Sequence, residues 1–310
     1  MNLIEWMNEG DVAIKYWVSR DLLSDLKLAK QFREKIATEG WGQAYLALRD
    51  PETMKWGNGI YSPKWISTHY TLLELKNLGL IPNREFEQSA QLLLDCMWQN
   101  QGLVRKGRYQ DMCVGAMILN ICAYGKLISE KLSEIVDYIL KNQKEDGGWN
   151  CDRTSLKGSL HTTLSVLEAF LEFERSGYTY RLEDIHRAIP EGEEFILRKQ
   201  LFRSVHSGEI IYPGFLICPY PSRWQYDILR ALEYFAKSGH AFDPRMEEAL
   251  NTLIERMDEN GRMPVEKAHP NLVFFKLESG RSKSRINTYR MLVVLKAFRP
   301  STFSELIKRT

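Results

Sequence analysis

No run of apolar residues in this sequence reaches the length of about 18 that a membrane-spanning helix needs, so we expect no transmembrane segment. A signal peptide is not predicted either, because the first residues, MNLIEWMNEGD, carry acidic side chains and no continuous apolar stretch. An excess of charge of one sign is also missing: 42 Lys and Arg oppose 40 Asp and Glu in 310 residues, a formal net charge of +2. We therefore expect no binding to nucleic acid, which usually requires an excess of basic residues.

Several catalytic motifs are missing as well. The sequence has no Gly-rich phosphate-binding loop, no His-Glu-x-x-His zinc motif and no Gly-x-Ser-x-Gly nucleophile motif. Cysteine is scarce and never spaced as Cys-x-x-Cys; the five residues are Cys96, Cys113, Cys122, Cys151 and Cys218. An odd number of dispersed cysteines, in a chain without a predicted signal peptide, favours reduced thiols and a cytoplasmic location.

The most informative stretch is residues 143–161, QKEDGGWNCDRTSLKGSLH. An amphipathic helix ends near Gln143, and Gly147 and Gly148 follow, a pair that tolerates the positive φ angles of a tight turn. Trp149 comes next, and a second helix begins near His161 after a short polar segment. The stretch predicts a turn between two helices in which one tryptophan packs.

The rest of the chain repeats this pattern of helices. Five largely apolar helices begin near residues 67, 111, 161, 223 and 285, at intervals of about 45 to 60 residues, and amphipathic helices and Gly-bearing turns separate them. No strand-rich region, linker or low-complexity segment interrupts the series. We predict an all-α protein with one domain over residues 1–310, in which residues 1–40 form a helical extension packed on the remainder.

Polar side chains recur at the starts of the apolar helices. They include Ser67 and His69, Asp111 and Cys113, His161 and Thr163, Arg223 and Gln225, and Asn287 and Thr288. If the helical hairpins form a ring, these helix starts converge on one mouth of a central cavity. Helix capping is the alternative explanation for the Ser, Thr and Asn members. Capping explains the His, Cys and Arg members poorly.

The sequence QKEDGGW at residues 143–149 resembles the QW motif of the terpenoid cyclase and protein prenyltransferase superfamily. Three stretches, WGNGIYSPKWISTHYTLLEL, DGGWNC and SLHTTLSVLEAFLEFERSG, look similar to bacterial proteins of this length that are described as prenyltransferase-like or squalene-cyclase-like. The resemblance extends over most of residues 40–300. It implies an α/α toroid, a barrel of helical hairpins, in which the motif's tryptophan stacks over its glutamine and joins one hairpin to the next.

What the resemblance implies about activity is less specific. Class II cyclases use an Asp-x-Asp-Asp motif and class I synthases an Asp-rich magnesium motif, and the sequence has neither. We therefore do not expect a typical cyclase but another transferase or lyase, which acts on an isoprenoid-like or other apolar substrate in a central cavity. One alternative is a toroid that binds a ligand or a protein without catalysis. Another is a glycan-processing toroid, which would need paired acids, for which only Asp111 and Asp227 qualify.

The resemblance also suggests a zinc site. Protein prenyltransferases bind zinc through Asp, Cys and His, and lanthionine cyclases, which are also toroids, use two Cys and a His. Here the matching residues are Cys113, Cys151 and His161, with Asp111 or water as the fourth ligand. The alternative is two buried cysteines and a hydrogen-bonded histidine.

The other candidate residues follow from the same cavity hypothesis. Arg223 is a candidate for binding an anion such as a diphosphate, and His69, Tyr226 and Asp227 are candidate catalytic groups that carry protons. The remaining candidate substrate-binding residues are Trp65, Tyr70, Trp224 and Asn287. For Trp65 the alternative is packing between hairpins.

Overall fold

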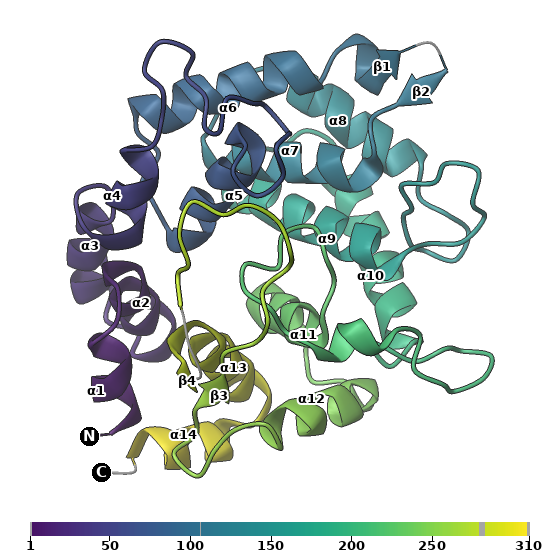
Figure 1. Cartoon of the computed structure of the whole chain (residues 1–310). Coiled ribbons are helices and arrows are strands. Elements are labelled where there is room, and N and C mark those ends of the chain that lie inside the picture. Colours follow the sequence, from purple (N-terminus) through teal and green to yellow (C-terminus); the bar gives the residue numbers. More distant parts are fainter. Residues whose placement is uncertain (1, 106, 279–282, 309–310) are drawn as a thin grey trace.

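The computed structural model describes residues 2–105, 107–278 and 283–308, and these are mostly helical (Figure 1), which confirms the all-α prediction. The α-helices are α1 (Leu3–Asn8), α2 (Val12–Trp17), α3 (Leu26–Lys35), α4 (Gly40–Leu46), α5 (Thr68–Leu78), α6 (Arg84–Met97), α7 (Met112–Tyr124), α8 (Glu130–Lys141), α9 (Leu160–Arg175), α10 (Leu182–Leu197), α11 (Ile228–Ser238), α12 (Glu247–Ile254), α13 (Arg285–Phe298) and α14 (Pro300–Lys308). A π-helix, Val18–Leu22, follows α2, and short 3-10 turns lie at Asn100–Gly102, Pro213–Leu216 and Pro244–Met246.

Strands in the described residues are short and form two antiparallel ribbons. One pairs β1 (Leu103–Arg105) with β2 (Arg108–Tyr109), and the other pairs β3 (Met263–Pro264) with β4 (Lys283–Ser284). In the described part of the chain no helix is both long enough and apolar enough to cross a membrane.

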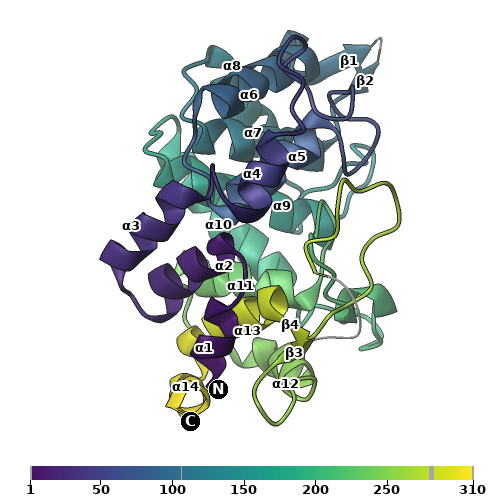
Figure 2. The ribbon, with the colours of Figure 1, turned by 60° about the vertical axis from the view of Figure 1, so that its left-hand side comes forward.

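The helices form an inner and an outer set. The inner helices α5, α7, α9, α11 and α13 contact one another in chain order, α13 contacts α2, and α4 contacts both α2 and α5 (Figures 1 and 2). Helix α7 is buried from Met112 to Ala123, as expected for a helix that is apolar on all sides. The outer helices are amphipathic: α6 packs on α5 and α7, α8 on α7, α10 on α9, and α12 on α11.

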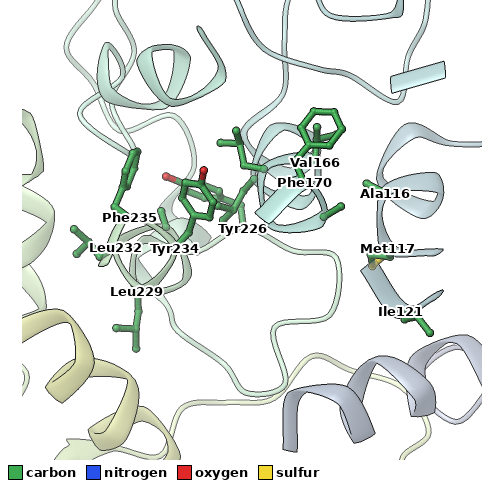
Figure 3. Close-up of a cluster of buried hydrophobic side chains, with 14 of the residues drawn as sticks. Ala116, Met117, Ile121, Val166, Phe170, Tyr226, Leu229, Leu232, Tyr234 and Phe235 are labelled. Carbon is green, nitrogen blue, oxygen red and sulfur yellow. The ribbon is translucent and has the colours of Figure 1, made fainter. Parts of the chain in front are cut away.

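Part of the buried core lies among the central helices (Figure 3). It includes Ala116, Met117 and Ile121 of α7, Val166 and Phe170 of α9, and Leu229, Leu232 and Phe235 of α11. Residues 3–22 also belong to this packing, since several of them lie against the last inner helix. Arg285 Nε donates to Trp6 O at 2.8 Å, Lys296 Nζ donates to Asp21 O at 2.7 Å, and the Trp17 ring stacks on Tyr289 with centroids 5.1 Å apart.

The turn around Trp149 is built by hydrogen bonds to three helices. The indole Nε1 donates to Ile139 O of α8 at 2.8 Å, and the backbone N–H donates to Thr163 Oγ1 of α9 at 2.9 Å. Gln143 Nε2 donates to Gly147 O at 2.8 Å and to Ala188 O of α10 at 3.1 Å. The motif therefore connects one hairpin to the next outer helix through buried polar contacts, which must be satisfied because water is excluded.

One predicted helix start differs in the structure, and one helix contains a proline. Helix α10, which begins at Leu182, has Pro190 in its interior. Helix α11 begins at Ile228 instead of residue 223, because Asp227 is its N-cap and accepts the N–H of Arg230 at 2.7 Å. Asp11 is the N-cap of α2, since its side chain accepts the N–H of Ala13 at 2.9 Å.

Candidate functional site

A cavity of about 950 Å³ lies among the inner helices, and α2, α5, α7, α9, α11 and α13 all contribute to its wall. Among the described lining residues, nine are basic and four are acidic. The basic ones are Arg20, Arg33, Lys76, Arg175, Arg223, Arg230, Lys237, Arg290 and Lys296, and the acidic ones are Asp21, Glu168, Glu172 and Glu233. A concave wall with this excess of cations favours an anionic ligand.

Apolar side chains line the same cavity between the charged groups. They are Trp17 of α2, Leu73 of α5, Met117 of α7, Leu171 of α9, and Ile286 and Val293 of α13. The wall therefore offers contacts both to an anionic group and to an apolar part of one ligand.

Two arginines deep in the wall pair with carboxylates of neighbouring helices. Arg230 makes a two-pronged pair with Glu168, at 2.9 Å from Nε and 2.6 Å from Nη2. Arg290 Nε donates to Glu233 at 2.8 Å, and Arg290 also lies 3.7 Å from Asp227. Burial alone would raise the pKa of Glu233, but Lys237 and Arg290 hold it at about 2.

The cations nearer the opening bind neutral oxygen atoms. Arg33 donates to Gly79 O at 2.9 Å and to the Tyr124 hydroxyl at 3.0 Å, and Arg175 donates to the carbonyl of Lys237. Lys296 donates to two backbone carbonyls of the π-helix, those of Asp21 and Leu22. Since these oxygens carry no formal charge, the three cations keep a positive potential that an anionic ligand could neutralise.

The cavity opens at the C-terminal halves of the inner helices. Its exposed lining residues include Asn77 of α5, Arg175 of α9 and Ala297 of α13. These residues lie away from the helix starts, where the sequence predicted the mouth. Of the predicted site residues, Arg223 is the one found among the described lining residues. The others, Trp65, His69, Tyr70, Asp111, Cys113, Cys151, His161, Trp224, Tyr226, Asp227 and Asn287, lie outside that set.

Two long connections cover the helix starts and explain this difference. One precedes α11 and the other follows β3, and the latter passes across the front of the inner helices in Figure 1. Trp65 Nε1 donates to Pro270 O of this second connection at 2.8 Å, and the ring of Phe275 packs on Tyr45 with centroids 4.6 Å apart. The chain itself occupies the end where the sequence predicted a mouth.

The covered end nevertheless gathers several predicted residues. The Arg223 guanidinium lies 5.5 Å from the Trp65 ring centroid and 3.9 Å from Glu74, and Trp65 meets Tyr70 edge-on with centroids 4.7 Å apart. Burial raises the pKa of Glu74. Arg223 has φ of 59°, an uncommon backbone conformation for a residue with a side chain.

His69 is completely buried between the rings of Tyr61 and Tyr70. Neither ring nitrogen has a hydrogen-bond partner in the described structure. Burial lowers the pKa of His69 to about 3, so the imidazole is neutral at neutral pH. A residue that carries protons in catalysis must be accessible to the substrate. The aromatic rings around His69 leave its imidazole no such access.

The connection before α11 is stabilised by hydrogen bonds of Tyr226, Asp227 and Asn287. The Tyr226 hydroxyl donates to Leu201 O at 2.6 Å, and Asn287 Nδ2 donates to Cys218 O at 2.8 Å. Asp227 caps α11. The predicted catalytic and substrate-binding roles of these residues stay predictions, and their contacts are those of buried structural groups.

The two cysteines predicted as metal ligands come together at the start of α7. Their Sγ atoms lie 3.1 Å apart, the Cys113 N–H donates to Cys151 Sγ at 3.3 Å, and Thr162 Oγ1 lies 3.4 Å from the same sulfur. The contact with Cys113 lowers the pKa of Cys151 to about 7, and the same contact raises the pKa of Cys113. Asp111 occupies the N-cap position of α7, where its side chain makes no capping bond.

His161 is engaged elsewhere. Its Nδ1 accepts the backbone N–H of Tyr226 at 2.8 Å, and its ring lies between Phe215 and Trp224, with centroid distances of 5.3 Å and 5.2 Å. Burial and the nearby Arg230 lower the pKa of His161 to about 4. Among the described residues no group of three or more His, Cys, Asp or Glu side chains could hold a metal ion. The residues thus fit a zinc site only in part, and zinc binding stays a prediction.

The charged residues of the cavity were missed from the sequence, although a signal was present. Glu168, Arg230, Glu233 and Arg290 each interrupt a helix that is otherwise largely apolar. A charge in such a helix is costly to bury alone, so it indicates a partner or a polar cavity.

Comparison with known proteins adds no family assignment. No protein-family model matches the chain, and no curated protein matches it.

Proposed function

We propose that this protein is an α/α toroid, similar to the terpenoid cyclases and protein prenyltransferases, that binds an anionic small molecule in a central cavity. The QW-like turns support the toroid, as does the order in which α5, α7, α9, α11, α13 and α2 contact one another. The observation that carries the function is the excess of basic side chains in the cavity wall.

The chemical class of the ligand follows from the distribution of basic and apolar side chains in the cavity wall. Basic groups of Arg33, Arg175 and Lys296 bind neutral oxygens and are available to an anion, whereas apolar side chains of α5, α7 and α9 lie between the charged groups. We therefore propose an amphiphilic anion, in which a phosphate or diphosphate group is attached to an apolar chain of isoprenoid type. A wholly apolar substrate would leave the cationic wall without a counter-charge, which is unfavourable.

Binding of three probes tests this proposal by isothermal titration calorimetry: inorganic diphosphate, a short prenyl diphosphate and the corresponding prenyl alcohol. We expect the prenyl diphosphate to bind most tightly and the alcohol least. The double variant Arg175→Gln/Lys296→Gln should weaken diphosphate binding by about tenfold or more, since each tenfold corresponds to 1.4 kcal/mol. Lys30→Gln, a change on the exposed face of α3, is the control.

Equal affinity of the double variant and the Lys30→Gln protein would overturn the cavity assignment. Tighter binding of the alcohol than of the diphosphate would overturn the ligand class. The same samples, assayed for release of diphosphate, separate a catalytic toroid from one that only binds.

A further inference from the structure

Cys113 and Cys151 form a close pair of thiols between two different hairpins. Their sulfur atoms lie 3.1 Å apart although the residues are 38 positions apart in the sequence. Of the other cysteines, Cys122 and Cys218 are buried and Cys96 is exposed. Both cysteines are free thiols in this structure, so their sulfur atoms are in contact but are not joined by a covalent bond.

We propose that Cys113 and Cys151 form a reversible intramolecular disulfide by exchange with a low-molecular-weight disulfide of the glutathione type. A disulfide bond needs the sulfurs at about 2.0 Å, an approach of about 1 Å from their present separation. Two thiolates on one tetrahedral zinc ion would instead stand about 3.8 Å apart, given zinc–sulfur bonds of about 2.3 Å. Together with the engagement of His161 by Tyr226, this separation favours sulfur–sulfur chemistry over a metal site.

The surroundings assign different roles to the two sulfurs. Cys151 is partly exposed, and its sulfur is contacted by the Cys113 N–H and by the Thr162 hydroxyl, two groups that can stabilise a thiolate by hydrogen bonding. Cys113 is buried directly behind it. Cys151 is therefore the attacking thiol, and Cys113 is the resolving thiol.

The exchange takes place in two steps that balance. The Cys151 thiolate attacks one sulfur of the small disulfide, which forms a mixed disulfide and releases one small thiolate that takes up a proton. Cys113 then loses its proton and attacks the Cys151 sulfur, which forms the protein disulfide and releases the second small thiol with that proton. Two protein thiols are oxidised by two electrons, and one small disulfide is reduced to two thiols.

The bond would connect the start of α7 to the segment that follows Trp149. Helix α7 contributes Met117, Asn120 and Tyr124 to the cavity wall, so oxidation would fix one wall helix to the neighbouring hairpin. A cross-link between distant positions also restricts the unfolded chain, which stabilises the folded state.

The experiment uses the full chain with four cysteine states: wild type, Cys113→Ser, Cys151→Ser and the control Cys96→Ser. Each protein is equilibrated with mixtures of oxidised and reduced glutathione, quenched in acid, alkylated and mapped by peptide mass spectrometry. We expect wild type and Cys96→Ser to yield linked peptides containing Cys113 and Cys151, and dithiothreitol to reverse the link. Cys113→Ser should stop at a mixed disulfide on Cys151.

Thermal unfolding gives a second readout. Oxidation should raise the melting temperature of wild type and Cys96→Ser by several degrees, but not that of either single-thiol variant. The proposal is overturned if Cys113 and Cys151 are both alkylated under conditions that oxidise Cys96. A mixed disulfide that persists on Cys151 in wild type would also overturn it. Stoichiometric zinc that is lost in Cys151→Ser would overturn it too and assign the pair to a metal.

Discussion

Trp56 and Trp149 make the same hydrogen bond in two different hairpins. The indole Nε1 of Trp56 donates to Tyr45 O at 2.7 Å, and that of Trp149 donates to Ile139 O at 2.8 Å. In each case the acceptor belongs to the helix before the turn, α4 for Trp56 and α8 for Trp149. Both rings are completely buried. The second tryptophan lies in the DGGW sequence, whereas the first lies in KWGNG, so the equivalence is structural and barely visible in the sequence.

The backbone of each turn repeats a second contact. The N–H of Trp56 donates to Thr68 Oγ1 at 3.1 Å, and the N–H of Trp149 donates to Thr163 Oγ1 at 2.9 Å. A third turn has methionine in place of tryptophan and keeps the bond: Met263 N–H donates to Thr288 Oγ1 at 2.9 Å. In three hairpins, a threonine near the start of an inner helix therefore accepts a hydrogen bond from the backbone N–H of the turn. This role differs from helix capping.

Thr163→Val should destabilise the protein by about 1 to 3 kcal/mol, because the buried N–H of Trp149 loses its acceptor while the side-chain shape is retained. Urea unfolding followed by circular dichroism measures the change. Thr179→Val, on an exposed turn, should differ from wild type by about 0.5 kcal/mol or less. Equal stability of the two variants would contradict the role given to Thr163.

Gly192→Ala should also be destabilising, by about 1 to 3 kcal/mol through overpacking. A Cβ at Gly192 of α10 would lie 2.7 Å from Cζ3 of the Trp149 ring, a distance that no methyl group tolerates. In Trp149→Phe the smaller ring leaves space, so the same glycine change should cost less. A double-mutant cycle on urea midpoints checks this. Additive effects of the two substitutions would show that contact with the Trp149 ring does not determine the cost of Gly192→Ala.

Arg230→Met should cost about 1 to 3 kcal/mol, since it removes the charge-assisted hydrogen bonds that the half-buried Glu168 carboxylate accepts in the cavity wall. The double variant Glu168→Met/Arg230→Met should recover part of this loss because no charge is left unpaired. Thermal unfolding of the three proteins compares them. A double variant less stable than Arg230→Met alone would argue against the pair as described.

Acidification below neutral pH should destabilise the protein through two histidines with lowered pKa values. Burial lowers the pKa of His69 to about 3 and that of His161 to about 4, whereas an unfolded histidine titrates near 6.5. Below about pH 6.5 the unfolded chain therefore binds protons that the folded chain does not, and stability falls by up to about 1.4 kcal/mol per pH unit for each histidine.

The prediction is tested by measuring the free energy of unfolding between pH 7 and pH 5. In this range the unfolded histidines gain protons and the two folded ones do not. His69→Phe should reduce the slope, and the exposed change Thr179→Val, which removes no titratable group, should leave it unchanged. An unchanged slope in His69→Phe would mean that His69 is protonated in the folded state.

Features that depend on neighbouring residues were predictable from the sequence. A helix was predicted to begin near residue 285, and α13 begins at Arg285, because the apolar pattern and the Ser284 cap are local. One long-range contact was predicted as well: Cys113 and Cys151, 38 positions apart, approach each other, since both lie where consecutive hairpins meet.

Other features that depend on distant segments were not predictable. His161 accepts the N–H of Tyr226, 65 residues away, and no spacing in the sequence indicates this. The connections over the helix starts carry no periodic pattern, so their position over Trp65 could not be inferred. As a result the sequence predicted a mouth at the helix starts, whereas exposed lining residues of the cavity lie towards the other ends of the inner helices.

The contact of α2 with α13 has a consequence for folding kinetics. These helices are separated by almost the whole chain, yet Trp17 stacks on Tyr289 and Lys296 donates to the π-helix next to α2. Bringing such distant segments together costs loop-closure entropy, and this cost is lowest once the intervening hairpins have become compact. We expect docking of α2 on α13 to be the last step of folding and the first to reverse, so amide hydrogens of α2 should exchange earlier than those of α7.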